Sequence, residues 1–456
     1  MKKFLSILLC ALCLLGSLLP VSTAALYEPT EEEVGAGSYY LFSSDDGMVI
    51  AEKNIDEKVA PASITKIVTA ILTIENCSDL EQVIAAPSYA IRLLDGTNSS
   101  TAGILVDEEM SVRNYLYCLL VYSANDAANV LADFIGGGSI ETFVGMMNDF
   151  VQKLGCTSTH FVNAHGLDDP DHYTTARDLG TIYSYCIKNS IFCEIAGTNR
   201  YEIEPTNKYA STRYLTNTNK MLNSGIADYY CEYVKNGKTG TTDNAGRCVI
   251  SSASYDGYNY ICVMMNAGFY DCDGDNVNEN MAFVWSKKMY EWVFENIKLR
   301  EVVSASEYIG ERAVNLSNKY DYVALVPANS VTALVPTGVD SSDVLVEMYP
   351  DDGAVNAPVK KGDVLGKAAI KYADNVIAEV DLVAAYDVER STLKYVVYVI
   401  KNIVTSKPFI IVASIVGMCL IILIVILIKA FLNKRRKKGD NIRYFKVGDK
   451  HKSKKK

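Results

Sequence analysis

A serine and a lysine separated by two residues could form a nucleophile and its base near position 63. The motif is Ser63-Ile64-Thr65-Lys66, at the start of a mostly apolar segment that predicts a helix over residues 62–76. Positions i and i+3 share one face of a helix, so the Lys66 amine can reach the Ser63 hydroxyl. Apolar neighbours would desolvate Lys66 and lower its pKa, which makes a neutral, proton-accepting amine available. Alone the motif is weak, because the same spacing recurs at Ser391 and Ser453, and a solvated pair is the ordinary interpretation.

A second polar pair lies at Ser123-Ala124-Asn125, which is the one Ser-x-Asn in the sequence. It falls between an apolar run and a helix expected to start at Asp126. A serine hydroxyl and an asparagine amide at such a junction can relay a proton and hold a substrate amide. Taken alone, a helix N-cap explains the pair better, because Ser and Asn both favour that position.

A third motif, Lys238-Thr239-Gly240-Thr241, is also unique and precedes an expected strand. Gly237 and Gly240 flank the Lys-Thr pair, and glycine allows a ligand to approach the backbone closely. Taken alone, a turn with an exposed lysine is the simpler interpretation.

The order of the three motifs is more informative than any one of them. They are separated by 60 residues (63 to 123) and 115 residues (123 to 238). This set resembles the serine penicillin-binding and β-lactamase superfamily. Five longer segments narrow the resemblance to D-alanyl-D-alanine carboxypeptidases of the low-molecular-mass penicillin-binding protein type: residues 60–66, 123–128, 159–170, 173–178 and 237–242. The resemblance covers residues 35–300, and residues 300–385 are more loosely similar to the β-domain that follows the catalytic domain in that family.

The resemblance implies a role for each motif residue. Ser63 would be the acylated nucleophile and Lys66 its general base. Ser123 would relay a proton to the leaving D-alanine nitrogen, and Asn125 would bind the peptide amide. The other implied roles concern the substrate's charge and the oxyanion: Lys238 supplies positive charge, Thr239 and Thr241 hold the terminal carboxylate, Gly240 allows close approach, and the backbone N–H groups of Ser63 and Thr241 form the oxyanion hole.

The implied substrate is the pentapeptide stem of peptidoglycan, from which the enzyme would remove the terminal D-alanine through an acyl-enzyme. β-Lactam antibiotics would act as covalent inhibitors, and no cofactor or metal is implied. Two alternatives stay open. One is a β-lactamase, which would release hydrolysed antibiotic rapidly. The other is a non-catalytic peptidoglycan-binding or sporulation-linked homologue, although the presence of all three motifs argues against a decayed site.

Charge is distributed unevenly along the chain. The formal net charge is −10, yet residues 429–456 carry 13 basic and 2 acidic side chains, so the main body is strongly acidic. Such a body would repel phosphate, which excludes nucleic acid as an expected partner.

Both ends of the sequence indicate export and membrane anchoring. Residues 1–24 have the charged, apolar and small-residue regions of a secretory signal peptide, with an uncleaved anchor as the alternative. An uncharged run predicts a transmembrane helix over residues 409–432, followed by a basic cytoplasmic tail at 433–456. A buried helix of a soluble protein is the alternative for that run. We therefore expect a single-pass protein of the cell membrane with its catalytic domain on the extracytoplasmic side.

The order of the predicted elements indicates an α+β fold. Strand patterns at 40–50 and 249–266 enclose helical segments at 62–76, 111–135, 140–154 and 178–188, and an aromatic-rich helix is expected at 279–297. The family resemblance implies an antiparallel sheet flanked by helices. The expected domains are the catalytic domain at 25–298, a small all-β domain at 299–385 and a juxtamembrane connector at 386–408.

Three histidines and an acidic run were weighed as metal sites. His160, His165 and His172 lie close together in the sequence, but their spacing matches no usual zinc pattern, so loop and packing roles are expected. Residues 271–276 place an acid at every second position, yet they lack the glycine and glutamate of a calcium loop, so a solvated turn is expected. Nine cysteines precede the predicted span after residue 24, and their spacing gives no disulfide pairing.

Overall fold

The computed structural model describes Tyr27 and residues 34–349, 353–372 and 375–443. The expected signal peptide at 1–24 and the tail beyond 443 lie outside the described residues. The chain forms two compact units. The first contains the chain up to 302 together with 332–345 and 370–378, and the second contains the rest. The expected domain boundaries at 298 and 385 stay predictions.

The first unit is built on a five-stranded antiparallel sheet with the order β2-β1-β9-β8-β7. Its first two strands form the hairpin expected near residues 40–50, and the segment expected to be one strand at 249–266 is a hairpin of two. The strands are β1 (Ala36–Ser43), β2 (Val49–Lys53), β7 (Val234–Thr242), β8 (Gly246–Tyr255) and β9 (Tyr258–Ala267).

Alternation along β1 gives the sheet two apolar faces, because successive side chains of a strand point to opposite sides. Tyr40 and Phe42 join one hydrophobic cluster, and Tyr39 and Leu41 join another. The second cluster is covered by α9 (Met281–Asn296), which agrees with the helix expected at 279–297.

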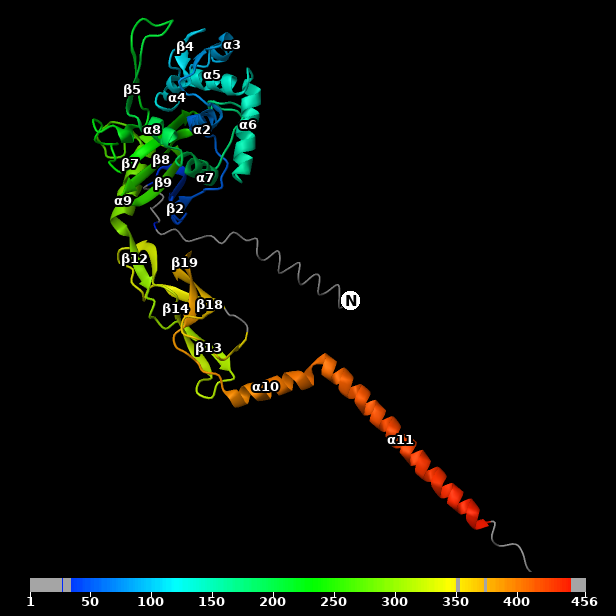
Figure 1. The fold of residues 1–456 in the computed structure, drawn as a ribbon. Helices are drawn as coiled ribbons and strands as arrows, with labels where there is room; N and C mark the ends of the chain where they lie inside the picture. The colour runs from blue at the N-terminus through cyan, green and yellow to red at the C-terminus, as the bar shows by residue number, and fades with distance from the viewer. Residues whose placement is uncertain (1–26, 28–33, 350–352, 373–374, 444–456) are drawn as a thin grey trace, which may run out of the picture. The chain divides into compact units, whose positions relative to one another are not determined.

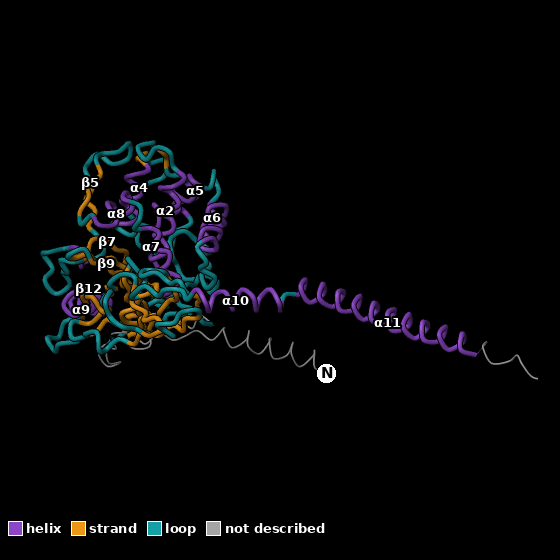
Figure 2. Tube along the Cα trace, turned by 60° about the horizontal axis from the view of Figure 1, so that its bottom comes forward, coloured by secondary structure: helices purple, strands orange, loops and turns teal. Residues whose placement is uncertain are grey.

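Most helices cover the first face, on the side away from α9 (Figures 1 and 2). The central one is α2, in which every residue from Lys66 to Ile74 is buried. A short 3₁₀ helix, η2, leads into it. The elements of this layer are η2 (Ala62–Thr65), α2 (Lys66–Asn76), α3 (Ser88–Arg92), α4 (Val112–Leu120), α5 (Asn125–Ile135), α6 (Ile140–Lys153), α7 (Ala176–Cys186) and α8 (Ser190–Gly197).

The helix expected across 111–135 is broken into α4 and α5. The break falls at Ser123, whose φ of +64° lies in the left-handed region that a helix does not use. The Asn125 N–H, which starts α5, instead donates to the carbonyl of Ser100 at 2.8 Å. The break therefore places the buried Ser-x-Asn motif at a helix junction.

Shorter elements complete the first unit around the sheet and the helices. They are three two-stranded ribbons and a 3₁₀ turn: β3 (Val83–Ala85) with β4 (Glu109–Ser111), β5 (Arg200–Ile203) with β6 (Arg213–Thr216), β10 (Phe269–Tyr270) with β11 (Glu279–Asn280), and η3 (Lys220–Leu222). A further pair joins β12 (Ile297–Val303) to β15 (Val331–Pro336).

The β-rich part of the chain contains a second sheet with the order β16-β18-β19-β14-β13-β17. Its strands cover the β-rich runs expected after residue 300, and small clusters around Val323 and Leu325 form its core. They are β13 (Gly310–Asn315), β14 (Tyr322–Pro327), β16 (Leu345–Tyr349), β17 (Val355–Asn356), β18 (Val364–Tyr372) and β19 (Asn375–Ala384).

Two helices end the described chain: α10 (Thr392–Thr405) and α11 (Lys407–Arg443). The first lies within the segment expected to be a connector. The second contains Lys407–Arg435, which is long and apolar enough to cross a membrane, and an 18-residue window within it has a mean hydropathy of 3.4. The expected span at 409–432 lies within it.

The nine cysteines between residues 77 and 272 are all free thiols. Six of them are buried, so they act as small apolar side chains of the core rather than as cross-links.

Candidate active site

The first motif lies where η2 passes into α2, deep in the first unit. The Lys66 side chain is fully buried, and its Nζ contacts three oxygens: Ser63 Oγ at 2.8 Å, Asn125 Oδ1 at 2.6 Å and the backbone carbonyl of His165 at 2.6 Å. Two of these partners are carbonyl oxygens, which can only accept. A neutral amine has two protons for them and one lone pair, so the lone pair faces the Ser63 hydroxyl. This geometry suits proton abstraction from Ser63.

The surroundings of Lys66 favour the neutral amine. Burial holds its pKa well below the usual range for lysine, and the positive charge of Lys238 lowers it further. Asp126 acts in the opposite direction. The depressed pKa of Lys66 is therefore the property that a general base needs near neutral pH.

The second and third motifs meet across the pocket. Lys238 on β7 is buried and donates from Nζ to Ser123 Oγ at 2.8 Å and to the Thr239 carbonyl at 2.8 Å. Burial lowers the pKa of Lys238 to about 7. The structure thus brings Ser63, Lys66, Ser123, Asn125 and Lys238 into one cluster.

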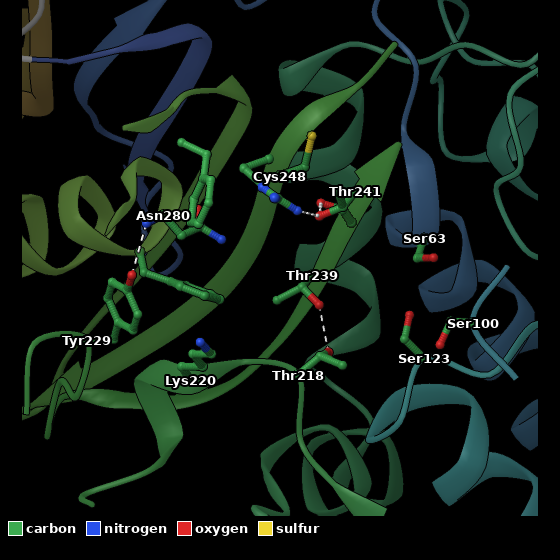
Figure 3. Close-up of a pocket in the computed structure, with 14 residues that line it drawn as sticks. Ser63, Ser100, Ser123, Thr218, Lys220, Tyr229, Thr239, Thr241, Cys248 and Asn280 are labelled. Atoms are coloured by element: carbon green, nitrogen blue, oxygen red, sulfur yellow. Dashed lines mark hydrogen bonds between the residues drawn. The ribbon is translucent and has the colours of Figure 1, made fainter. Parts of the chain in front are cut away.

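Glycine is favoured at position 240 by a close approach to the nucleophile's backbone. A Cβ on Gly240 would lie 3.0 Å from Ala62 Cβ, 3.1 Å from the Pro61 carbonyl oxygen and 3.2 Å from Ser63 N. β7 therefore runs directly beside η2, with Thr241 one residue further along the strand. The Thr239 hydroxyl lies 2.6 Å from that of Thr218 (Figure 3).

A pocket of about 390 Å³ opens beside these residues (Figure 3). It is lined by Ser63, Ser123, Thr239, Gly240 and Thr241, all of which the sequence predicted as site residues. Lys66, Asn125 and Lys238 lie behind this lining.

Nine further residues line the pocket and were not predicted as site residues, among them Ser100, Thr218 and Arg247. Arg247 Nη1 lies 3.4 Å from Thr241 Oγ1, because β8 pairs with β7 and places Arg247 opposite Thr241. The short turn at 243–245 between two strand patterns could have indicated that pairing.

The loop that carries Ser100 is held beside the pocket by the buried carboxylate of Asp126. Asp126 accepts the backbone N–H groups of Ala102 at 3.0 Å and Ile104 at 2.9 Å, which fastens the loop that carries Ser100 to the start of α5. Burial raises the pKa of Asp126, and the backbone N–H donors oppose that rise. No short-range sequence pattern indicates this contact.

Among the described residues, the carboxylates of the acidic run lie close enough together to hold a metal ion, and none of the three histidines joins them. His165 supplies its carbonyl to Lys66, and burial lowers the pKa of its ring to about 3. In the acidic run, the carboxylates of Asp271, Asp273 and Asp275 lie near one another, and each accepts backbone N–H groups of its own loop.

These features define a class of enzyme. A buried amine contacts a serine hydroxyl, and the backbone of a strand lies beside that serine. Enzymes that work through a serine acyl intermediate have this arrangement. The sequence matches the D-alanyl-D-alanine carboxypeptidase family model over residues 25–268 and the model of the C-terminal domain of penicillin-binding protein 5 over 298–390. The chain belongs to the D-alanyl-D-alanine carboxypeptidase family, and it is a serine-type D-Ala-D-Ala carboxypeptidase.

Individual relatives agree with this assignment. The chain is 29% identical to the D-alanyl-D-alanine carboxypeptidase DacF of Bacillus subtilis (strain 168) over 397 residues, which covers 86% of this chain and 96% of that protein. It is similar to the crystal structure of penicillin binding protein 5 from Haemophilus influenzae, with 26% identity, a TM-score of 0.58, and coverage of 80% of this chain and 100% of the other. The Streptomyces K15 DD-transpeptidase is similar over 58% of this chain and 96% of its own, with 26% identity and a TM-score of 0.51. The expected family, fold class and enzyme class are confirmed.

Proposed function

We propose that the enzyme trims the terminal D-alanine from peptidoglycan stem pentapeptides, with Ser63 as the acylated nucleophile and Lys66 as its base. The observation that carries this proposal is the contact of Lys66 Nζ with Ser63 Oγ and with two carbonyl oxygens that can only accept. In this proposal Asn125 has two roles: its side-chain oxygen accepts from Lys66 Nζ, and its amide N–H₂ donates to a substrate carbonyl that reaches it.

Acylation begins when the Ser63 proton moves to Lys66 Nζ and Ser63 Oγ attacks the carbonyl carbon of the penultimate D-alanine. The resulting oxyanion is held by the backbone N–H groups of Ser63 and Thr241. As the C–N bond breaks, Ser123 gives its proton to the leaving nitrogen and regains one from Lys238, whose pKa of about 7 suits that exchange. Water then attacks the ester and gives one proton to Ser63 Oγ, which releases the shortened peptide and restores Ser63. Lys66 loses its extra proton and Lys238 regains one by exchange with solvent, which returns the site to its starting state.

The substrate's terminal carboxylate is bound on the β7 side of the pocket. Thr239 and Thr218 present neighbouring hydroxyls there, and Arg247 supplies the positive charge beside Thr241. Arg247 also lies over the Phe269 ring at 4.7 Å, which holds the guanidinium at the pocket wall. A β-lactam carries a carboxylate in a similar position, so it would occupy the same groups and acylate Ser63.

Covalent labelling tests this proposal on the full-length protein in detergent. Benzylpenicillin should add one drug mass to Ser63, and D-alanine should be released from a defined pentapeptide. Ser63→Ala should lose both. Ser391→Ala is the matched control, because Ser391 belongs to the other Ser-x-x-Lys spacing in the described residues and caps α10, and it should keep both. An unlabelled wild type, or a labelled Ser63→Ala, refutes the assignment; rapid drug turnover would indicate a β-lactamase instead.

Association with a membrane is indicated by α11 and the relatives, and we propose a single span with the catalytic unit on the extracytoplasmic side. Lys434 and Arg435 begin a basic cluster at the end of the apolar stretch, and such clusters stay cytoplasmic. The apolar side chains Leu393, Val397 and Ile400 of α10 are more than half exposed, which suits a position at the lipid interface. Protease added outside intact cells should digest the segment before residue 408, and its protection would overturn this topology.

A further inference from the structure

The residue before the nucleophile has an unusual backbone conformation. Ala62 is fully buried and has a φ of +47°, in the left-handed region that costs a non-glycine residue about 1–2 kcal/mol. Such a conformation persists only where the surroundings hold it. What holds it here is a chain of hydrogen bonds behind the active site that the acyl-transfer steps do not use.

The chain runs from a backbone N–H through an imidazole and a hydroxyl to a carbonyl. Val162 N donates to His172 Nδ1 at 3.0 Å, and His172 Nε2 lies 2.8 Å from Thr65 Oγ1. Thr65 Oγ1 in turn donates to the Ala62 carbonyl at 2.9 Å. Thr65 and His172 are both buried, at 0% and 2% exposure, so water does not compete for these groups.

The direction of each bond is fixed by the chemistry of its atoms. Nδ1 accepts from a backbone N–H, so a neutral His172 carries its proton on Nε2. Burial lowers the pKa of His172 to about 4, which keeps the ring neutral near neutral pH. Nε2–H therefore donates to Thr65 Oγ1, and the Thr65 proton is left to point at the Ala62 oxygen.

That oxygen belongs to the same peptide group as the N–H of Ser63. A trans peptide is planar and its C=O and N–H point in opposite directions, so fixing the Ala62 oxygen also fixes the direction of the Ser63 N–H. Two glycines pack closely against this peptide group, one at its oxygen and one at its nitrogen. A Cβ on Gly166 would lie 1.8 Å from the Ala62 oxygen, and one on Gly240 would lie 3.2 Å from Ser63 N.

We propose that Thr65 and His172 are positioning residues that orient the Ala62–Ser63 peptide so that the Ser63 N–H faces the oxyanion. This inference rests on the proposed function, because it takes Ser63 as the acylated residue. These hydrogen bonds involve neither the substrate nor the reacting Ser63 hydroxyl. Its loss should therefore slow acylation without weakening the initial, non-covalent binding of the drug.

Thr65→Val tests the proposal, because valine keeps the shape of threonine and removes only the hydroxyl. In the full-length protein in detergent, the acylation rate constant with benzylpenicillin should fall about 100-fold, near the lower end of the effect of losing an oxyanion donor. The dissociation constant of the preceding complex should change less than about threefold. Thr65→Ser, which keeps the hydroxyl, should acylate within a few-fold of the wild type.

Thr73→Val is the matched control for removing a buried threonine hydroxyl. Thr73 is on α2, the helix that begins directly after Thr65, is fully buried and donates to the Thr69 carbonyl at 2.7 Å. It should lower the thermal midpoint but keep normal acylation. If Thr65→Val does not fold, Thr65→Cys, whose S–H is a weaker donor, gives the same comparison with a smaller rate loss.

The outcomes separate the two proposals. Wild-type acylation in a folded Thr65→Val or Thr65→Cys overturns the positioning role, and so does an equal rate loss in Thr73→Val. A loss confined to the binding constant overturns it as well. If the wild type itself is not acylated at Ser63, the proposed function fails first.

Discussion

Replacing Lys238 by methionine should make the catalytic unit more stable while it destroys acylation. The Lys238 side chain is 1% exposed, and burial lowers its pKa to about 7 from 10.5. The folded state therefore releases this proton near pH 7, whereas the unfolded chain keeps it up to about pH 10.5. Between these values the unfolded state binds more protons, so the stability of the wild type rises with pH across this window.

The size of the effect follows from the pKa and the hydrogen bonds. A fall from 10.5 to about 7 corresponds to about 5 kcal/mol of destabilisation, fully present below pH 7 and lost as the pH approaches 10.5. Methionine removes that penalty but forfeits the two bonds to Ser123 and Thr239, roughly 1–2 kcal/mol each. The net gain below pH 7 is about 1–3 kcal/mol, or a few degrees in the thermal midpoint.

Thermal unfolding of the full-length protein at about pH 6 and about pH 10 measures this directly. The thermal midpoint of Lys238→Met should be higher than that of the wild type at the lower pH. At the higher pH it should be equal to or lower than that of the wild type. Lys235→Met is the control, because Lys235 is exposed on the same strand and should not change the pH dependence. A stability difference that is the same at both pH values, or a loss at the lower one, refutes the buried-charge argument.

Three other perturbations follow from the site. The pKa values of His165 and His172 in the folded protein are about 3 and about 4, below the unfolded value of 6.5. The free energy of unfolding should therefore fall as the pH drops from 6.5 toward 4, by about 3 kcal/mol for His172 alone. An acid titration followed by circular dichroism measures this loss. Asp126→Asn removes a charge that raises the pKa of Lys66, so the acid limb of the acylation rate should move to lower pH in a pH–rate profile, and a limb that stays in place contradicts this role. Gly240→Ala should slow benzylpenicillin acylation by about tenfold or more, because its Cβ would press on the backbone at the nucleophile, and an unchanged rate would show that the contact relaxes without cost.

The local part of the site was predictable from sequence. Ser63 and Lys66 are one helical turn apart, so their contact depends only on a helix that the apolar spacing already indicates. Lys238 and Thr241 were found through a motif, and the strand that carries them was expected. The same reasoning placed the sheet and the helices around it, since alternation and helical periodicity are local properties.

The rest depended on contacts between distant segments. Ser100 and Thr218 enter the pocket through backbone and side-chain contacts that no short pattern encodes. The break at Ser123 was predicted only in part. A helix was expected to start at Asp126, yet residues 111–135 were also expected to form one helical segment, and the contact of Asn125 with the Ser100 carbonyl shows where the helices separate. For the same reason His172 was expected to have a packing role, and its hydrogen bond to Thr65 became evident only with the fold.

The pairing of β1 with β9 links Tyr39 to Met264, two ends of the first unit. A chain that crosses a membrane with its N-terminus leading therefore cannot close this sheet until the β9 segment has also emerged. Until then the sheet that contains β7, whose residues line the pocket, is incomplete. Strand pairing between segments so far apart in the sequence is slow to form. Under the topology proposed above, the enzyme would therefore become competent for chemistry only late in its translocation, and its apolar strands would stay unpaired and prone to aggregation until then.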